Sequence, residues 1–125
     1  MRLLRAWLPP TLWALVIYMA SALSGSALPP LPALNADKLV HACVYAVLGA
    51  LLVRAIRDST RFGRGASVLL AGLLATGYGA SDELHQRFVP FRSPDPADLA
   101  ADAVGGLLGA LTFTLIVARR LRRDR

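Results

Sequence analysis

Four long apolar stretches, separated by short polar connections, dominate the 125 residues of this chain. Each approaches the roughly 20 apolar residues that an α-helix needs to cross a bilayer. The second and third stretches are slightly short and gain length from polar residues at one end. Short connections make sequential helices antiparallel. The pattern therefore predicts an all-α fold: an integral membrane four-helix bundle that forms one domain over residues 1–125, with helices at about 6–28, 37–56, 66–86 and 96–118.

The first apolar stretch shares features with a secretory signal peptide. Arg2 and Arg5 precede an apolar core, and the small residues SGSA follow it. The core is longer than that of a typical signal peptide, and Pro9 and Pro10 stand at its start. Because three further spans need no cleaved leader, we interpret the stretch as a retained helix.

Composition supports a membrane protein. Hydrophobic residues make up 55% of the chain, its mean hydropathy is +0.50 and its net charge is +6. Such a chain predicts a surface that faces lipid. Its arginines cluster at the ends of the apolar stretches, which favours a membrane surface over nucleic acid. We therefore expect the lipid bilayer as a partner and no nucleic acid. Cys43 is the one cysteine, so it forms no disulfide within the chain, and we expect it to pack as a small core residue.

The arginines also predict an orientation. They precede the first helix, separate the second from the third, and follow the fourth, so four spans place them all on one side. Positive residues favour the cytoplasmic side, which puts both termini in the cytoplasm and leaves Lys38, Arg87 and Arg92 on the outer side. The groups are Arg2 and Arg5; Arg54, Arg57, Arg61 and Arg64; and Arg119, Arg120, Arg122, Arg123 and Arg125.

Polar residues gather at the predicted outer ends of the last three helices. In the second helix, Asp37, His41 and Tyr45 follow one another at i, i+4 and i+8 and share a face, with Lys38 beside them. In the third helix, a face of small residues that lets another helix approach ends in Glu83 and Gln86. That face contains Gly72, Thr76 and Gly79, and the other polar face contains Tyr78, Ser81, Asp82 and His85.

The fourth predicted helix carries an acidic face that leads into a close-packing seam. Asp95, Asp98 and Asp102 lie along it, and Gly105 and Gly109 continue it. Structural roles account for part of this pattern. Asp95 before Pro96 can be an N-cap, and Asp98 can complete a capping box.

Other polar residues have equally simple roles. Asp37 suits the helix dipole, while Asp82, His85 and the two outer arginines can face headgroups. Asp102, by contrast, lies past any capping position, and an acid at the bilayer centre costs about 2.5–3.5 kcal/mol. Asp102, Glu83 and His41 are therefore the strongest functional candidates.

The segments DKLVHACVYAVLGALL and ASDELHQRFVPFRSPDPADLAADAVGGLLGAL resemble the VanZ-like family, over roughly residues 35–112. The family is named for a bacterial membrane protein linked to teicoplanin resistance. The resemblance implies a multi-pass protein of the bacterial cytoplasmic (inner) membrane. Relatives often have Asn at the position of Asp102. The residues that match the family pattern are Asp37, Lys38, His41, Glu83, Gln86, Arg92, Asp98, Gly105 and Gly109.

Our first functional hypothesis is binding of an anionic cell-envelope component at the outer face, with an effect on glycopeptide (teicoplanin) tolerance. Lys38, Arg92 and Arg87 would attract a lipid phosphate or carboxylate, and the carboxylates would accept hydrogen bonds. The expected ligand-binding residues are Asp37, Lys38, His41, Glu83, Gln86, Arg92, Asp98 and Asp102.

The second hypothesis is a membrane enzyme that acts on an envelope lipid. Glu83 and His41, with Asp102 as the third candidate, would perform acid–base chemistry. A metal variant would use these three with His85, but no spacing typical of a metal motif supports it.

The third hypothesis is a small ion or lipid transporter that works as a homo-oligomer, because acids within a membrane can form ion sites. We expect no organic cofactor, since the chain has neither a P-loop nor a Rossmann glycine pattern.

Overall fold

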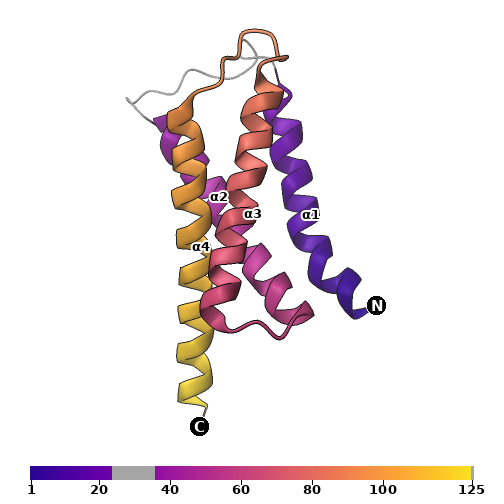
Figure 1. The fold of residues 1–125 in the computed structure, drawn as a ribbon, viewed down its shortest axis with the longest axis vertical. Helices are drawn as coiled ribbons and strands as arrows, with labels where there is room; N and C mark the ends of the chain where they lie inside the picture. Colours follow the sequence, from indigo (N-terminus) through magenta and orange to yellow (C-terminus); the bar gives the residue numbers. More distant parts are fainter. Residues whose placement is uncertain (24–35, 125) are drawn as a thin grey trace.

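The computed structural model of the chain describes residues 1–23 and 36–124. Within these ranges it contains no strand and four helices, which confirms the all-α prediction. In Figure 1 sequential helices run antiparallel, and the two ends of the chain lie at the same end of the bundle. The helices are α1 (Arg2–Ser21), α2 (Ala36–Ser59), α3 (Arg64–Gln86) and α4 (Pro96–Arg123).

The observed helices differ from the predicted ranges mainly at their ends. α1 already begins at Arg2 and contains Pro9 and Pro10 inside it. Its predicted continuation to residue 28 lies in part outside the described residues. α4 continues to Arg123, because Leu and Arg are good helix formers and nothing in the sequence breaks the helix where the apolar stretch ends.

Three of the helices in the described ranges are long and apolar enough to cross a membrane: α1, α2 and α4. α3 does not reach the same hydropathy because it carries several glycines and a polar end. It nevertheless has 23 residues, a length of about 35 Å, and it runs alongside its neighbours (Figure 1). Gly72 and Gly79 of α3 lie against α4 and not against lipid. Part of α3 is therefore covered by protein, and a lower mean hydropathy is sufficient for this helix.

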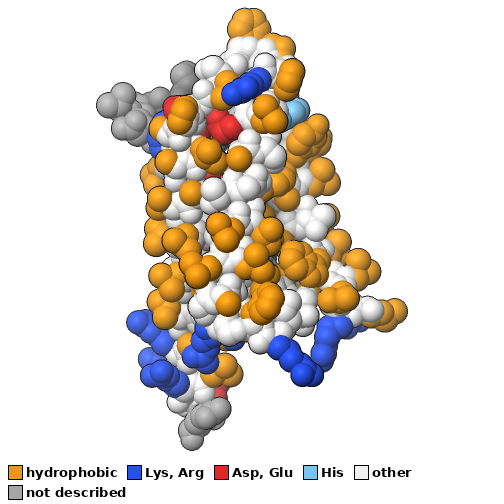
Figure 2. Space-filling view, in the orientation of Figure 1, with side chains coloured by type: hydrophobic (Ala, Val, Ile, Leu, Met, Phe, Trp, Pro, Cys, Tyr) orange, Lys and Arg blue, Asp and Glu red, His pale blue; other side chains and the backbone are white. Residues whose placement is uncertain are grey.

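The surface divides into an apolar middle and two charged ends. In Figure 2 apolar side chains cover the middle of the visible face, and Lys and Arg side chains gather at the end that holds the termini. Many large apolar side chains are exposed, among them Leu69 and Leu73 of α3 and Leu108 of α4. A surface of this kind is suited to a lipid environment.

Cys43 does not pack in the core as the sequence suggested: its side chain is exposed on α2. The expectation was wrong because lipid accepts a small apolar side chain as readily as a protein core does. In a membrane helix, therefore, an apolar residue does not imply burial within the protein.

α2 and α4 approach one another so closely that glycine is required. A Cβ at Gly105 would collide with the backbone carbonyl of Ala42, and one at Gly109 with that of Ala46. From the other side, a Cβ at Gly49 would collide with the carbonyl of Gly106. Contacts of this type let two membrane helices pack backbone to backbone.

α3 packs against the neighbouring face of α4, and its glycines also lie at the contact. A Cβ at Gly79 would lie 2.7 Å from Asp102 Oδ2, and one at Gly72 would lie 3.2 Å from a methyl group of Leu107. The polar residues that follow Gly79 on α3 are therefore held next to the start of α4.

Aromatic side chains attach α1 to the other helices by hydrogen bonds to backbone or hydroxyl oxygens. Trp13 Nε1 donates to the carbonyl oxygen of Val44 at 3.0 Å. Trp7 Nε1 donates to Ser59 Oγ at 3.0 Å, and the Tyr78 hydroxyl donates to the carbonyl of Ala14 at 2.6 Å. These bonds fix the position of α1 along α2 and α3, although α1 has only four buried residues.

We expect Gly109→Ala to destabilise the fold by about 1–3 kcal/mol, because the added methyl group forces α2 and α4 apart. Gly77→Ala is the matched control, since Gly77 is also on a helix and has no atom within 4 Å of an added Cβ. The control should be neutral or stabilising by up to about 1 kcal/mol. Unfolding by dodecyl sulfate in mixed micelles measures both. Equal stability of the two variants would refute close packing at Gly109.

Candidate ligand-binding site

Lys38 lies at the centre of the polar end of the bundle. Its Nζ is 2.8 Å from Asp37 Oδ2, 2.6 Å from Asp95 Oδ2 and 2.7 Å from Asp98 Oδ1. These carboxylates come from α2, from the connection between α3 and α4, and from the first turn of α4. One ammonium group thus joins three segments, and its charge is already more than balanced.

Asp95 has several contacts at once. Its Oδ1 accepts a hydrogen bond from the backbone N–H of Ala97 at 2.8 Å, so Asp95 is the N-cap of α4 with Pro96 in the first helical position. Its own backbone N–H donates to Glu83 Oε2 at 2.8 Å. The ammonium of Lys38, with help from the cap hydrogen bond, lowers the pKa of the Asp95 carboxyl.

His41 and Asp102 form a pair inside the bundle. His41 Nδ1 is 2.9 Å from Asp102 Oδ1, and Asp102 is fully buried. An ionised carboxylate only accepts hydrogen bonds, so this contact suits the His41 tautomer with its proton on Nδ1. The amide oxygen of an asparagine could accept the same hydrogen bond. On the other side of the ring, Nε2 lies 3.8 Å from Asp98 Oδ2.

Glu83 completes a compact group with His41 and Asp102. One possible ligand atom from each residue lies within 4.8 Å of the others. Glu83 Oε1 and Asp102 Oδ2 are buried and have no hydrogen-bond partner among the described residues. This donor set could hold a divalent cation, or it could exchange protons with a bound molecule. His85 does not join the group, because its ring lies against Tyr18 with the centroids 4.8 Å apart.

A cavity of about 370 Å³ opens beside this group. Its lining combines apolar side chains from α1 and α2 with polar side chains from α1, α2, α3 and the connection after α3. The apolar residues are Ile17, Ala20, Val40 and Val44. The polar residues are Ser21, Asp37, His41, Tyr45, Asp82, Gln86 and Arg92. A lining of this mixed kind suits an amphiphile.

The connection between α3 and α4 places Arg92 at the rim of this cavity. Val89 is buried and anchors the connection, and its carbonyl accepts from the backbone N–H of Arg92 at 3.2 Å. Phe91 has φ 59°, a left-handed conformation that is uncommon for a bulky residue. Arg92 Nε makes one long hydrogen bond, 3.5 Å, to the carbonyl of Leu23. Such a strained turn near a cavity is often functional.

The structure brings most of the sequence candidates together, with some exceptions. Arg87 is exposed and does not line the cavity. The hydroxyl of Ser81 donates to the carbonyl of Tyr78 at 2.7 Å. Asp82, placed by the sequence on a separate face from Gln86, is buried beside it and accepts from Gln86 Nε2 at 3.3 Å.

Asp82 and Tyr45 are cavity residues that the sequence reasoning did not select. The i, i+4 spacing of Asp82 and Gln86 could have indicated that Asp82 lies beside Gln86. Tyr45 is almost fully buried, and its hydroxyl has no partner within the described ranges. The contribution of Ile17 from α1 had no signal in the sequence, because it depends on where α1 packs.

Comparison with known families gives one match: the model of the VanZ/LLP1 family matches residues 5–117, which include most of α1 and α4. No curated protein matches the chain. No solved structure matches it either.

We expect Lys38→Met to destabilise the protein near neutral pH, because three carboxylates lose their common partner. The pKa of Asp95 is lowered in the folded state, so its contribution is present above the ordinary aspartate pKa of about 3.9 and is lost as the pH falls through the lowered value. Lys38→Met should lose this acid-sensitive contribution.

Dodecyl sulfate titrations near neutral pH and at about pH 3 measure both effects. Lys38→Arg retains the charge and is the control, for which we expect a smaller loss. Identical curves for wild type and Lys38→Met at both pH values would contradict a structural role of this ammonium group.

Proposed function

The chain belongs to the VanZ/LLP1 family, and we propose that it is a multi-pass protein of the bacterial cytoplasmic membrane that binds an anionic, amphiphilic cell-envelope component at its outer face. The main support is the cavity, whose lining combines apolar side chains with carboxylates, His41 and Arg92. An acyl or prenyl chain would contact Ile17, Val40 and Val44. The phosphate or carboxylate of the headgroup would bind Arg92.

Arg92, and not Lys38, is the residue we assign to the anion. Lys38 already has three carboxylates within 2.8 Å, so a further anion there would be repelled. Within the described ranges Arg92 has one long contact, to a carbonyl oxygen, and no ion pair with a carboxylate. A guanidinium group can bind a phosphate or carboxylate through two parallel hydrogen bonds.

The acids that line the cavity would select the remainder of the headgroup. Asp37 and Asp82 line the cavity together with His41 and Gln86. Carboxylates accept hydrogen bonds from hydroxyl or amino groups, and they repel a headgroup that carries only negative charge. We therefore propose a ligand that combines an anionic group with hydroxyl or amino groups, as a sugar- or peptide-bearing lipid does.

The orientation follows from the arginines. Both termini and the connection between α2 and α3 lie at one end (Figure 1), and positive residues favour the cytoplasmic side. The cavity would then face outward, where envelope intermediates and glycopeptides meet. An effect on teicoplanin tolerance would follow from changed access to such an intermediate.

Arg92→Ala should reduce the amount of co-purifying envelope lipid about tenfold, because it removes a charge-assisted contact. Arg87→Ala is the matched control, since Arg87 belongs to the same connection but lies outside the cavity, and its lipid content should equal that of the wild type. Mass spectrometry of the purified proteins measures this. Unchanged lipid in Arg92→Ala, or equal losses in both variants, would rule out binding through Arg92.

An enzyme is the second candidate, and the distance of 2.9 Å between His41 Nδ1 and Asp102 Oδ1 favours it. A carboxylate that orients a histidine is a common arrangement in acid–base catalysis, and Glu83 lies within reach of both. The transporter hypothesis gains no comparable support, because Gly105 and Gly109 pack against α2 within one chain.

Glu83→Gln separates binding from catalysis. The glutamine carbonyl can still accept from the backbone N–H of Asp95, so the fold and lipid binding should persist. If Glu83 acts as an acid or base, conversion of the bound lipid should fall by about 100-fold or more. Mass spectrometry of the lipid before and after incubation measures the conversion. Equal conversion by wild type and variant would remove Glu83 from the chemistry.

A further inference from the structure

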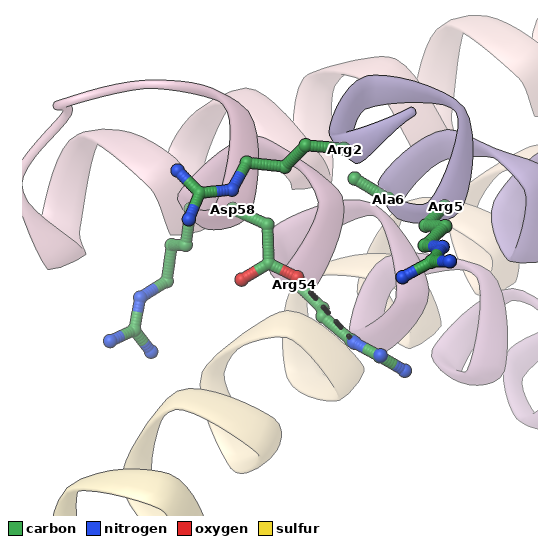
Figure 3. A pocket seen from close by; sticks show the side chains of 6 residues that line it. Arg2, Arg5, Ala6, Arg54 and Asp58 are labelled. Atoms are coloured by element: carbon green, nitrogen blue, oxygen red, sulfur yellow. Dashed lines mark ion pairs between the residues drawn. The ribbon is translucent and has the colours of Figure 1, made fainter.

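The opposite end of the bundle contains a second hollow, of about 530 Å³. It lies between the start of α1 and the end of α2, and Figure 3 shows the side chains of both helices around it. The residues that line it are Arg2, Arg5 and Ala6 of α1 and Arg54, Arg57 and Asp58 of α2.

The hollow has a large excess of positive charge. Asp58 is the one acid that lines it, and it pairs with Arg54 at 3.7 Å, with both side chains about half exposed (Figure 3). Within the described ranges no ion pair is formed by Arg2, Arg5 or Arg57. Neighbouring like charges repel one another, so an anion among these guanidinium groups would remove an unfavourable interaction.

The two walls of the hollow are held at a fixed separation. Trp7 Nε1 donates to Ser59 Oγ at 3.0 Å, and these residues adjoin the arginines on each helix. Ala6, which lines the hollow, is buried, as are Ala55 and Ile56 of α2. The arginines thus extend from two helices that are packed against one another.

Exposed apolar side chains lie on the same segment of α1 as two of the arginines. Leu3, Leu4 and Leu8 are exposed by 62%, 69% and 47%; the first two lie between Arg2 and Arg5 in sequence, and Leu8 follows. A free anion in water would not use these leucines, whereas the chains of a lipid would cover them while its headgroup met the arginines. This arrangement favours a lipid over a soluble phosphate.

We propose that the hollow formed by Arg2, Arg5, Arg54 and Arg57 is a binding site for the phosphate group of an anionic lipid headgroup. Guanidinium groups match phosphate geometry through paired hydrogen bonds, and basic pockets between membrane helices suit such headgroups. This site is separate from the cavity at the other end and does not depend on its function. It would secure α1, the helix with little burial of its own.

The test is titration of the purified chain in neutral detergent with phosphatidylglycerol, followed by native mass spectrometry. The double variant Arg54→Gln/Arg57→Gln should weaken binding about tenfold, because it removes charge-assisted contacts. Arg122→Gln/Arg123→Gln removes the same charge from the same end of the molecule but outside the hollow, and it should change binding less than about twofold. Circular dichroism verifies that both variants are folded.

A second pair, Arg2→Gln/Arg5→Gln, tests the α1 wall and should also weaken binding about tenfold. Equal weakening by pocket and control variants would show a general charge effect and overturn the proposal, as would no weakening in either pocket variant. Inorganic phosphate titrated in place of the lipid identifies the source of the phosphate group. Weaker binding of phosphate than of lipid supports the headgroup, and binding as tight as that of the lipid would assign the hollow to a free anion and overturn the lipid site.

Discussion

The polar end of this protein depends on one ammonium group. Lys38 Nζ contacts carboxylates from α2, from the α3–α4 connection and from the first turn of α4. Without it, three aspartates would repel one another at the edge of a low-dielectric bundle. Asp95 also connects this ion cluster to α3, because it caps α4 and donates its backbone N–H to Glu83 of α3. The connection that carries Arg92 is thereby held over the cavity.

The second constraint is the close packing of α4 against α2 and α3. Gly105 and Gly109 let α4 touch the backbone of α2, and Gly79 leaves room for the side chain of Asp102. Asp102 can therefore be fully buried and still reach His41. In a membrane an acid in such a position needs a partner, so the glycines and the His41–Asp102 pair depend on one another.

The molecule has two polar ends of opposite character. One gathers carboxylates around one lysine, one histidine and an arginine at the rim, and the other gathers arginines. The first suits a ligand with hydroxyl or amino groups as well as an anion. The second, with three guanidinium groups that have no ion pair in the described part of the chain, suits phosphate alone. Both adjoin exposed or cavity-lining apolar residues, which is why lipids are the ligands we propose at each end.

The number and approximate extent of the helices, and the small residues suited to close contact, could be predicted from the amino-acid sequence, because these depend on local hydropathy and on residue size. The sequence also indicated that Asp37, His41, Glu83 and Asp102 would lie at one end. The packing of the helices was needed to show three further features: Lys38 contacts three carboxylates whereas Arg92 has one long contact within the described residues, Asp82 and Tyr45 line the cavity, and Cys43 is exposed. Each of these depends on the rotation of a helix about its axis and on which helix packs beside it. The periodicity of the sequence fixes neither the rotation nor the neighbour, because lipid and the protein interior are both apolar surroundings.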